Sequence, residues 1–125
     1  MAAFEYSGIA KSLPLDTATS MAYSNLSGPV NFTSGASITH SAGDLIIGYA
    51  GCNYGEGAVS IVSTFTQIQN NPNGGCDIVE STIAGMAGLQ STVFNIRNNN
   101  DGNYVTELMA AFRPALTNVA RREGD

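Results

Sequence analysis

The chain of 125 residues suits one domain with a buried core, and its formal net charge is −5. Phosphate binding needs clustered positive charge, but the chain has only 5 Lys and Arg residues. No apolar run approaches the ~20 residues that a membrane-spanning helix requires. The composition therefore argues against direct nucleic-acid binding and against a membrane partner.

The first 28 residues show no sustained hydrophobic period, and Pro14 and Pro29 interrupt any strand there. We expect an edge strand or an arm in this region, with residues 1–15 as the arm. Free in water, such a segment would expose more apolar surface than a tail should, so it must pair with its own sheet or dock on another subunit. The residues expected to bind a partner are Phe4, Tyr6, Ile9, Leu13 and Leu15.

Turn-forming clusters then recur at short intervals along the chain, separated by runs rich in β-branched and aromatic residues. This spacing predicts an all-β protein, a single antiparallel sandwich over residues 1–125, with a C-terminal tail at 115–125. No window has a convincing helical face, and 115–122 would form at most one short turn. Strands are predicted near 3–9, 29–33, 36–40, 44–52, 58–68, 76–84, 91–97 and 103–113.

Alternation within a strand predicts which side chains face the core. In "YVTELMAAFR" the uncharged set Tyr104, Leu108, Ala110 and Phe112 is expected inside, and the set with Val105, Glu107, Met109 and Arg113 outside. The same reasoning buries Val59, Ile61 and Phe65 in "AVSIVSTFTQI". The run "DLIIGYAGC" (44–52) is apolar on both faces, which predicts a central strand.

Asp44 lies between the turn "SAG" and this apolar run. A carboxylate at the end of a turn usually accepts hydrogen bonds from nearby backbone N–H groups, so we interpret Asp44 as a structural residue. The lone His40, with Asp44 and a serine, could nominally supply a hydrolase triad, but no Gly-x-Ser-x-Gly elbow is present.

Other candidate sites are equally unspecific. Glu56 with Asp44 or Asp77 could form a glycosidase pair only if their loops met. The loop "NNNDGN" (98–103) lacks the spaced acidic residues of an EF-hand. A sugar-stacking platform would need tyrosines such as Tyr23, Tyr49 and Tyr54 on one side, although tyrosines of the core or rim are the favoured interpretation. The sequence predicts no catalytic residue, no cofactor and no metal site.

Cys52 and Cys76 show no zinc-binding spacing. The N-terminus has no basic region ahead of an apolar core, so we expect synthesis in the cytoplasm. The cysteines are then predicted to be thiols, with a disulfide between them as the alternative.

The stretches "SAGDLIIGYAG" (41–51), "FTQI" (65–68) and "ELMAAFRP" (107–114) resemble a β-sandwich domain of bacteriophage virion and tail-associated proteins and of bacterial surface proteins. The resemblance covers roughly residues 20 to 114. It implies a jelly-roll-like, non-catalytic module on a virion or cell surface, and it carries over no catalytic residues.

The function expected from these observations is a non-enzymatic virion protein, a bacteriophage capsid decoration (cement) protein. Its partners would be the major capsid protein or other virion subunits, and it would act as a homo-oligomer. The alternative is a carbohydrate-binding or adhesion module of a tail fibre or surface protein, in which Tyr49 or Tyr54 would contact a glycan.

Overall fold

The computed structural model describes residues 4–26, 29–52, 59–70, 78–96 and 103–116. The regular secondary structure of these residues is β-strand, and the strands pair in antiparallel fashion. The strands are β1 (Leu15–Leu26), β2 (Val30–Thr33), β3 (Ser37–Thr39), β4 (Leu45–Cys52), β5 (Val59–Ile61), β6 (Thr66–Asn70), β7 (Ile78–Ile83), β8 (Gly88–Gln90), β9 (Val93–Ile96) and β10 (Asn103–Phe112).

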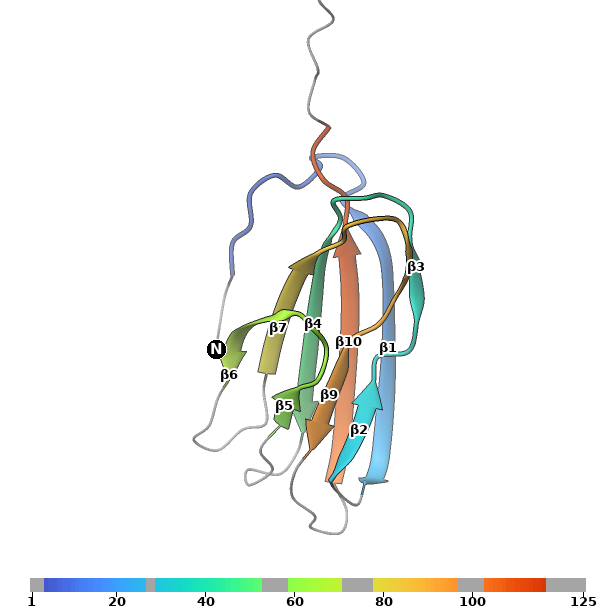
Figure 1. Ribbon diagram of the computed structural model, residues 1–125, viewed down its shortest axis with the longest axis vertical. Helices are drawn as coiled ribbons and strands as arrows, with labels where there is room; N and C mark the ends of the chain where they lie inside the picture. Colours follow the sequence, from blue (N-terminus) through green and yellow to red (C-terminus); the bar gives the residue numbers. More distant parts are fainter. Residues whose placement is uncertain (1–3, 27–28, 53–58, 71–77, 97–102, 117–125) are drawn as a thin grey trace, which may run out of the picture.

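The strands form a large sheet, a small sheet and a short ribbon. Five strands make the large sheet in the order β1-β10-β4-β7-β6, three make the small sheet in the order β2-β9-β5, and β3 pairs with β8. The small sheet lies across one face of the large one, so the fold is a two-layer antiparallel β-sandwich (Figure 1). The predicted fold class is confirmed. The jelly-roll connectivity that the resemblance implies stays a prediction.

The N-terminal region contains an edge strand, but not at the predicted place. Residues 3–9 were expected to form a strand, whereas β1 spans Leu15–Leu26 and lies at the edge of the large sheet. Its sequence, "LDTATSMAYSNL", places small residues such as Ala18 and Ala22 on the outward face, so its alternation is weak. The predicted strand 58–68 is two strands, β5 and β6, and β8 was not predicted.

The central position of β4 agrees with its sequence. It is third of five in the large sheet, between β10 and β7. Ile46 and Ala50 face the small sheet and are fully buried, while Ile47 and Tyr49 on the other face are partly covered. A strand enclosed on both sides can afford apolar residues on both faces, which explains the unbroken run.

The prediction of which β10 side chains face the core is wrong, because the alternate set is buried. Val105, Glu107 and Met109 are buried against the small sheet, whereas Tyr104 and Leu108 are 58% and 43% exposed on the outer face. The charged side chain of Glu107 suggested an outward face, yet Glu107 has no exposed surface. The other predicted core residues, Ala110 and Phe112, also lie on the outer face and are partly covered.

The core between the sheets has two apolar clusters. One joins the large sheet to aromatic residues of the small sheet, and the other lies nearer the start of β4. Buried polar residues lie between the clusters. The first cluster is Phe32, Ala50, Ile78, Phe94 and Val105, and the second is Ile46, Ala84, Met109 and Ala111.

The prediction of a thiol at Cys52 is wrong, because Cys52 is disulfide-bonded. It ends β4, two residues beyond Ala50, which pairs with the first residue of β7. The end of a central strand has neighbouring chain close on both sides, where a cross-link needs little rearrangement. Cys76 lies outside the described residues.

Candidate functional site

Residues 4–9 of the predicted arm lie over the outer face of the large sheet, and the name arm refers to these residues from here on. Residues 8–14 are fastened to the chain after β10 by backbone hydrogen bonds. Ala10 N–H donates to the Arg113 carbonyl over 2.9 Å, and Ala115 N–H donates to the Gly8 carbonyl over 2.6 Å. Arg113 N–H also donates to the Pro14 carbonyl over 2.7 Å. Residues 4–7 make no such backbone bond with the described chain, so side-chain contacts hold them.

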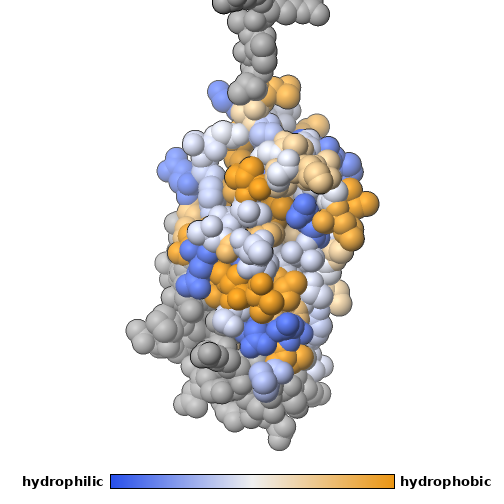
Figure 2. Space-filling model, in the orientation of Figure 1, coloured by the Kyte–Doolittle hydropathy of each residue, from blue (hydrophilic) through white to orange (hydrophobic). Residues whose placement is uncertain are grey.

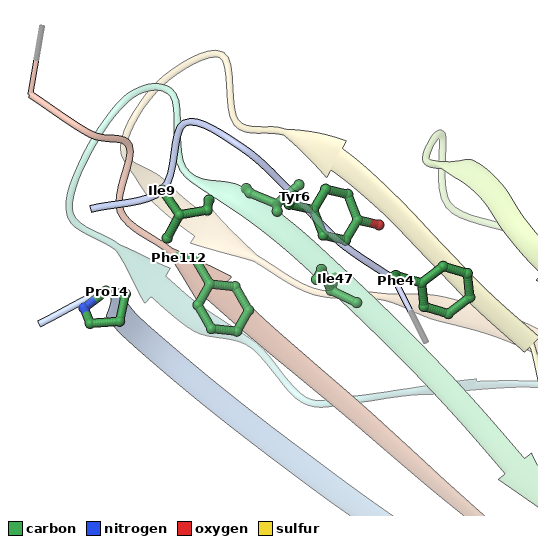
Figure 3. Close-up of a pocket in the computed structure, with 7 residues that line it drawn as sticks. Phe4, Tyr6, Ile9, Pro14, Ile47 and Phe112 are labelled. Atoms are coloured by element: carbon green, nitrogen blue, oxygen red, sulfur yellow. The ribbon is translucent and has the colours of Figure 1, made fainter. Parts of the chain in front are cut away.

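These side chains line an apolar groove of about 460 Å³ between the arm and the sheet. Tyr6 and Phe4 lie along β4 near Ile47, and Ile9 lies near Phe112 (Figure 3). Phe4 keeps 43% of its surface exposed, so the arm covers the groove without sealing it. The groove is lined by Phe4, Tyr6, Ile9, Pro14, Leu45, Ile47 and Phe112.

The structure brings together three of the five residues expected to bind a partner. Phe4, Tyr6 and Ile9 share the groove, whereas Leu13 and Leu15 do not line it and are 77% and 50% exposed. Leu13 has a φ of 47°, a left-handed conformation that is rare for a leucine. The five residues could not be told apart from the sequence, because the groups are separated only by the turn between Ile9 and Leu13.

A cluster of charged residues lies at the base of the arm, where β1, β3, β4 and β10 end or begin. The Asp16 carboxylate, itself fully buried, accepts a hydrogen bond from His40 N–H at 2.6 Å and pairs with the Arg113 guanidinium at 2.9 Å. Arg113 Nη1 also donates to the Leu13 carbonyl over 2.8 Å. Asp16 and Arg113 together therefore fix the turn that leads into the arm.

Asp44 completes this cluster, but not in the predicted way. It is fully buried, and neither carboxylate oxygen has a donor among the described residues. Burial, with the neighbouring Asp16 carboxyl and its charge, raises the pKa of Asp44 to about 6. Burial acts in the same direction on Asp16, but hydrogen bonds from His40 and with Asp44 outweigh it and hold the pKa of Asp16 below its usual value. A proton on Asp44 is the donor that can join the two carboxyls.

The backbone of Asp44, in contrast, has a structural role. Its carbonyl accepts a 2.8 Å hydrogen bond from Ala84 N–H, and Gly43 N–H donates to the Ala84 carbonyl over 2.8 Å. These bonds join the start of β4 to the end of β7. The prediction that the Asp44 side chain satisfies backbone N–H groups is therefore wrong, because Asp16 does this instead.

Two further carboxyls lie between the sheets, and the sequence did not predict their burial. Thr92 donates its hydroxyl to Glu107 over 2.6 Å, and Ser63 donates to Glu80 over 2.6 Å. The second oxygen of each glutamate has no partner among the described residues. Burial raises the pKa of Glu80, and burial together with the charge of Glu80 raises the pKa of Glu107 to about 8 despite the Thr92 hydrogen bond.

Gly48 of β4 makes room for this polar layer. A Cβ at Gly48 would lie 2.5 Å from Thr92 Cγ2 and 3.1 Å from Glu80 Cγ. The absence of a side chain there lets Thr92 reach across the sandwich to Glu107. Because Glu80 and Glu107 have no exposed surface, a substrate in solution has no access to either carboxyl.

Two of the tyrosines considered for a sugar-binding platform, Tyr23 and Tyr49, lie on opposite faces of the large sheet. Tyr23 packs edge-on against Phe32, with ring centroids 6.0 Å apart, and donates its hydroxyl to the Thr33 carbonyl over 2.7 Å. Tyr49 lies on the opposite face of the large sheet, paired with Leu108. Tyr54 lies outside the described residues, as do Glu56 and Asp77 of the glycosidase hypothesis.

In the described ranges no three His, Cys, Asp or Glu side chains meet in a way that could hold a metal ion. The described part of the chain also has no helix long and apolar enough to cross a membrane. Comparisons with protein-family models, curated proteins and solved structures find no match. On the three-stranded side, hydrophobic residues form separate patches among polar ones (Figure 2).

Proposed function

We propose that the protein is a non-enzymatic structural protein of a virus particle, a jelly-roll-like bacteriophage decoration protein that stabilises the shell through protein–protein contacts. The observation that supports this most is the arm, which holds apolar side chains on the sheet face beside an unfilled groove. An apolar groove with an exposed aromatic residue at its rim is suited to protein contact rather than to polar chemistry.

The placement of the ionisable groups agrees with a binding role. Glu80 and Glu107 are enclosed between the sheets, and the Asp16 carboxylate is committed to Arg113 and His40. A catalytic carboxyl must reach its substrate, and none of these three carboxyls is exposed. These groups are arranged to hold the sandwich and the arm in position.

The proposed mechanism is repeated apolar contact. Burial of apolar surface contributes ~25 cal/mol per Å², so one aromatic anchor gives a modest gain. Many copies on one shell add these gains, because each bound copy holds its neighbours near their own sites. The partner would be the major capsid protein or another virion subunit, and the location would be the virion.

The test uses shells of the virus that encodes the protein, purified without it. Phe4→Asp places a charge at the rim of the groove, and we expect it to abolish co-sedimentation with the shells and their added thermal stability. Leu13→Asp is the matched control, since Leu13 is exposed outside the groove and the variant should bind like the wild type. Equal binding of both variants, or no binding of the wild type, would contradict the proposal.

A further inference from the structure

None of the residues that the strand register places on the outer face of the large sheet is charged. Ala110 on β10 pairs with Ala18 on β1 and Ile47 on β4, and Leu108 pairs with Ser20 and Tyr49. Residues paired directly across antiparallel strands share a face. On β1, β4, β7 and β10 this set is Leu15, Ala18, Ser20, Ala22, Leu45, Ile47, Tyr49, Gly51, Val79, Ser81, Ile83, Tyr104, Thr106, Leu108, Ala110 and Phe112.

The part of this face beyond the arm mixes small with large side chains. Tyr49 lies along its own strand over Gly51, where a Cβ would come within 3.1 Å of the Tyr49 ring atom Cε1. Leu108 is 43% exposed beside the small residues of β1. An uncharged face with both protrusions and hollows can pack on a copy of itself without opposing like charges.

The face alone is too small for a stable pair. Four strands about 4.8 Å apart and seven residues long at about 3.4 Å each cover roughly 450 Å² of flat area. A stable interface buries about 800 Å² on each partner. Further contact must come from a neighbouring segment, and the arm borders this face.

The arm can supply that contact because residues 4–7 can turn about Gly8. Gly8 has a φ of 80° with open space around it, and residues 8–14 remain fastened to the end of β10. Four extended residues span about 13 Å, whereas facing sheets pack about 10 Å apart. An arm of this length can therefore cross to a second copy.

We propose that two copies pack through their outer sheet faces and that each arm, turning at Gly8, places Phe4 and Tyr6 against Ile47 and Phe112 of the other copy. Within one chain Phe4 and Tyr6 already line this groove together with Ile47 and Phe112, so an identical arm can make the same contacts on a second copy. This inference rests on the proposed function for its role in shell assembly, but self-association is a property of the protein alone.

Sedimentation equilibrium of the purified full chain tests the interface. We expect a dimer for the wild type and at least about tenfold weaker association for Leu108→Asp, because the buried charge would lack a partner. Leu89→Asp is the matched control, since Leu89 is 69% exposed on β8, away from this face, and should leave the dimer intact. A monomeric wild type, or equal association of the two variants, would overturn the inference.

Arm exchange is tested by NMR on a mixture of isotope-labelled and unlabelled chains. Contacts between the Phe4 ring and the Ile47 methyl groups should appear between molecules, and purely intramolecular contacts in a dimer would overturn the exchange. Glycan binding by a monomer, lost in Tyr49→Ala, would assign the face to a sugar and overturn the inference as well. Dimerisation without shell binding would instead refute only the proposed function, so the two failures are distinguishable.

Discussion

The two faces of the large sheet differ in a way that reverses ordinary expectation. The inner face, covered by the small sheet, holds Glu80 and Glu107, whereas the outer face is uncharged and half open to solvent. Charge normally marks the solvent side of a strand. Here both carboxyls are held inside by hydroxyl groups of Ser63 and Thr92, and the arm lies over part of the apolar outer side.

The largest expected effect concerns pH and the inner face. The pKa of Glu107 is raised to about 8 in the folded protein. The contribution of the protonated Glu107 side chain to stability is therefore complete below the pKa that Glu107 has in the unfolded chain, and it is lost as the pH rises toward 8. The free energy of unfolding should fall by about 3–4 kcal/mol between pH 5 and pH 8. The raised pKa of Glu80 acts in the same direction.

Urea denaturation of Glu107→Gln at both pH values checks this prediction. The variant should lose much less stability on going to pH 8, because its amide does not titrate. Glu5→Gln, which alters an exposed carboxylate on the arm, is the control and should keep the wild-type pH profile. If the stability of the wild type were constant from pH 5 to pH 8, Glu107 would not be buried in its protonated form.

Two glycines of β4 allow a direct comparison of the faces. Gly48→Ala should lower the free energy of unfolding by about 2–3 kcal/mol, because its Cβ would collide with the rigid Thr92 between two packed sheets. Gly51→Ala should cost about 1 kcal/mol or less, because Tyr49 on the outer face can swing toward solvent. Thermal or urea unfolding of both variants measures the difference, and equal losses would show that the outer face is packed as tightly as the core.

Asp44 extends the comparison to the end of the sheet. Its raised pKa, about 6, means that its stabilising contribution is lost as pH rises through 6. Asp44→Asn should therefore stabilise the protein by about 1–2 kcal/mol at pH 7, since the amide can donate to Asp16 without a charge. The gain should vanish at pH 4, and Asp16→Asn should destabilise the protein at pH 7. A loss of stability in Asp44→Asn at pH 7 would contradict the paired-carboxyl arrangement.

The smallest expected effect lies on the outer face. Leu108→Thr should change the stability of the isolated chain by no more than about 0.5 kcal/mol, because Leu108 is 43% exposed. Val105→Thr, which replaces one methyl group by a hydroxyl group on the buried face, should cost more than about 1 kcal/mol because it buries that hydroxyl. Denaturation at low protein concentration compares them, and a large loss from Leu108→Thr would mean that this face is already covered within one chain.

The sequence by itself determined the fold class, most strand positions and the central place of β4. These follow from local patterns: turn-forming clusters, β-branched runs and an unbroken apolar stretch. The sequence also indicated the apolar arm. It failed for β1, whose small outward residues give little alternation, and it placed a strand at 3–9 where the arm crosses the sheet.

Only the tertiary structure decided which face of β10 is buried, and the reason is a partner 15 residues away in sequence. Glu107 can lie inside because Thr92 reaches it past Gly48, a contact that no local pattern records. Asp44 likewise depends on Asp16, which chain folding brings to it from β1. The polarity of a side chain makes burial costly, but the hydrogen bonds and protons that its neighbours supply decide whether it is buried.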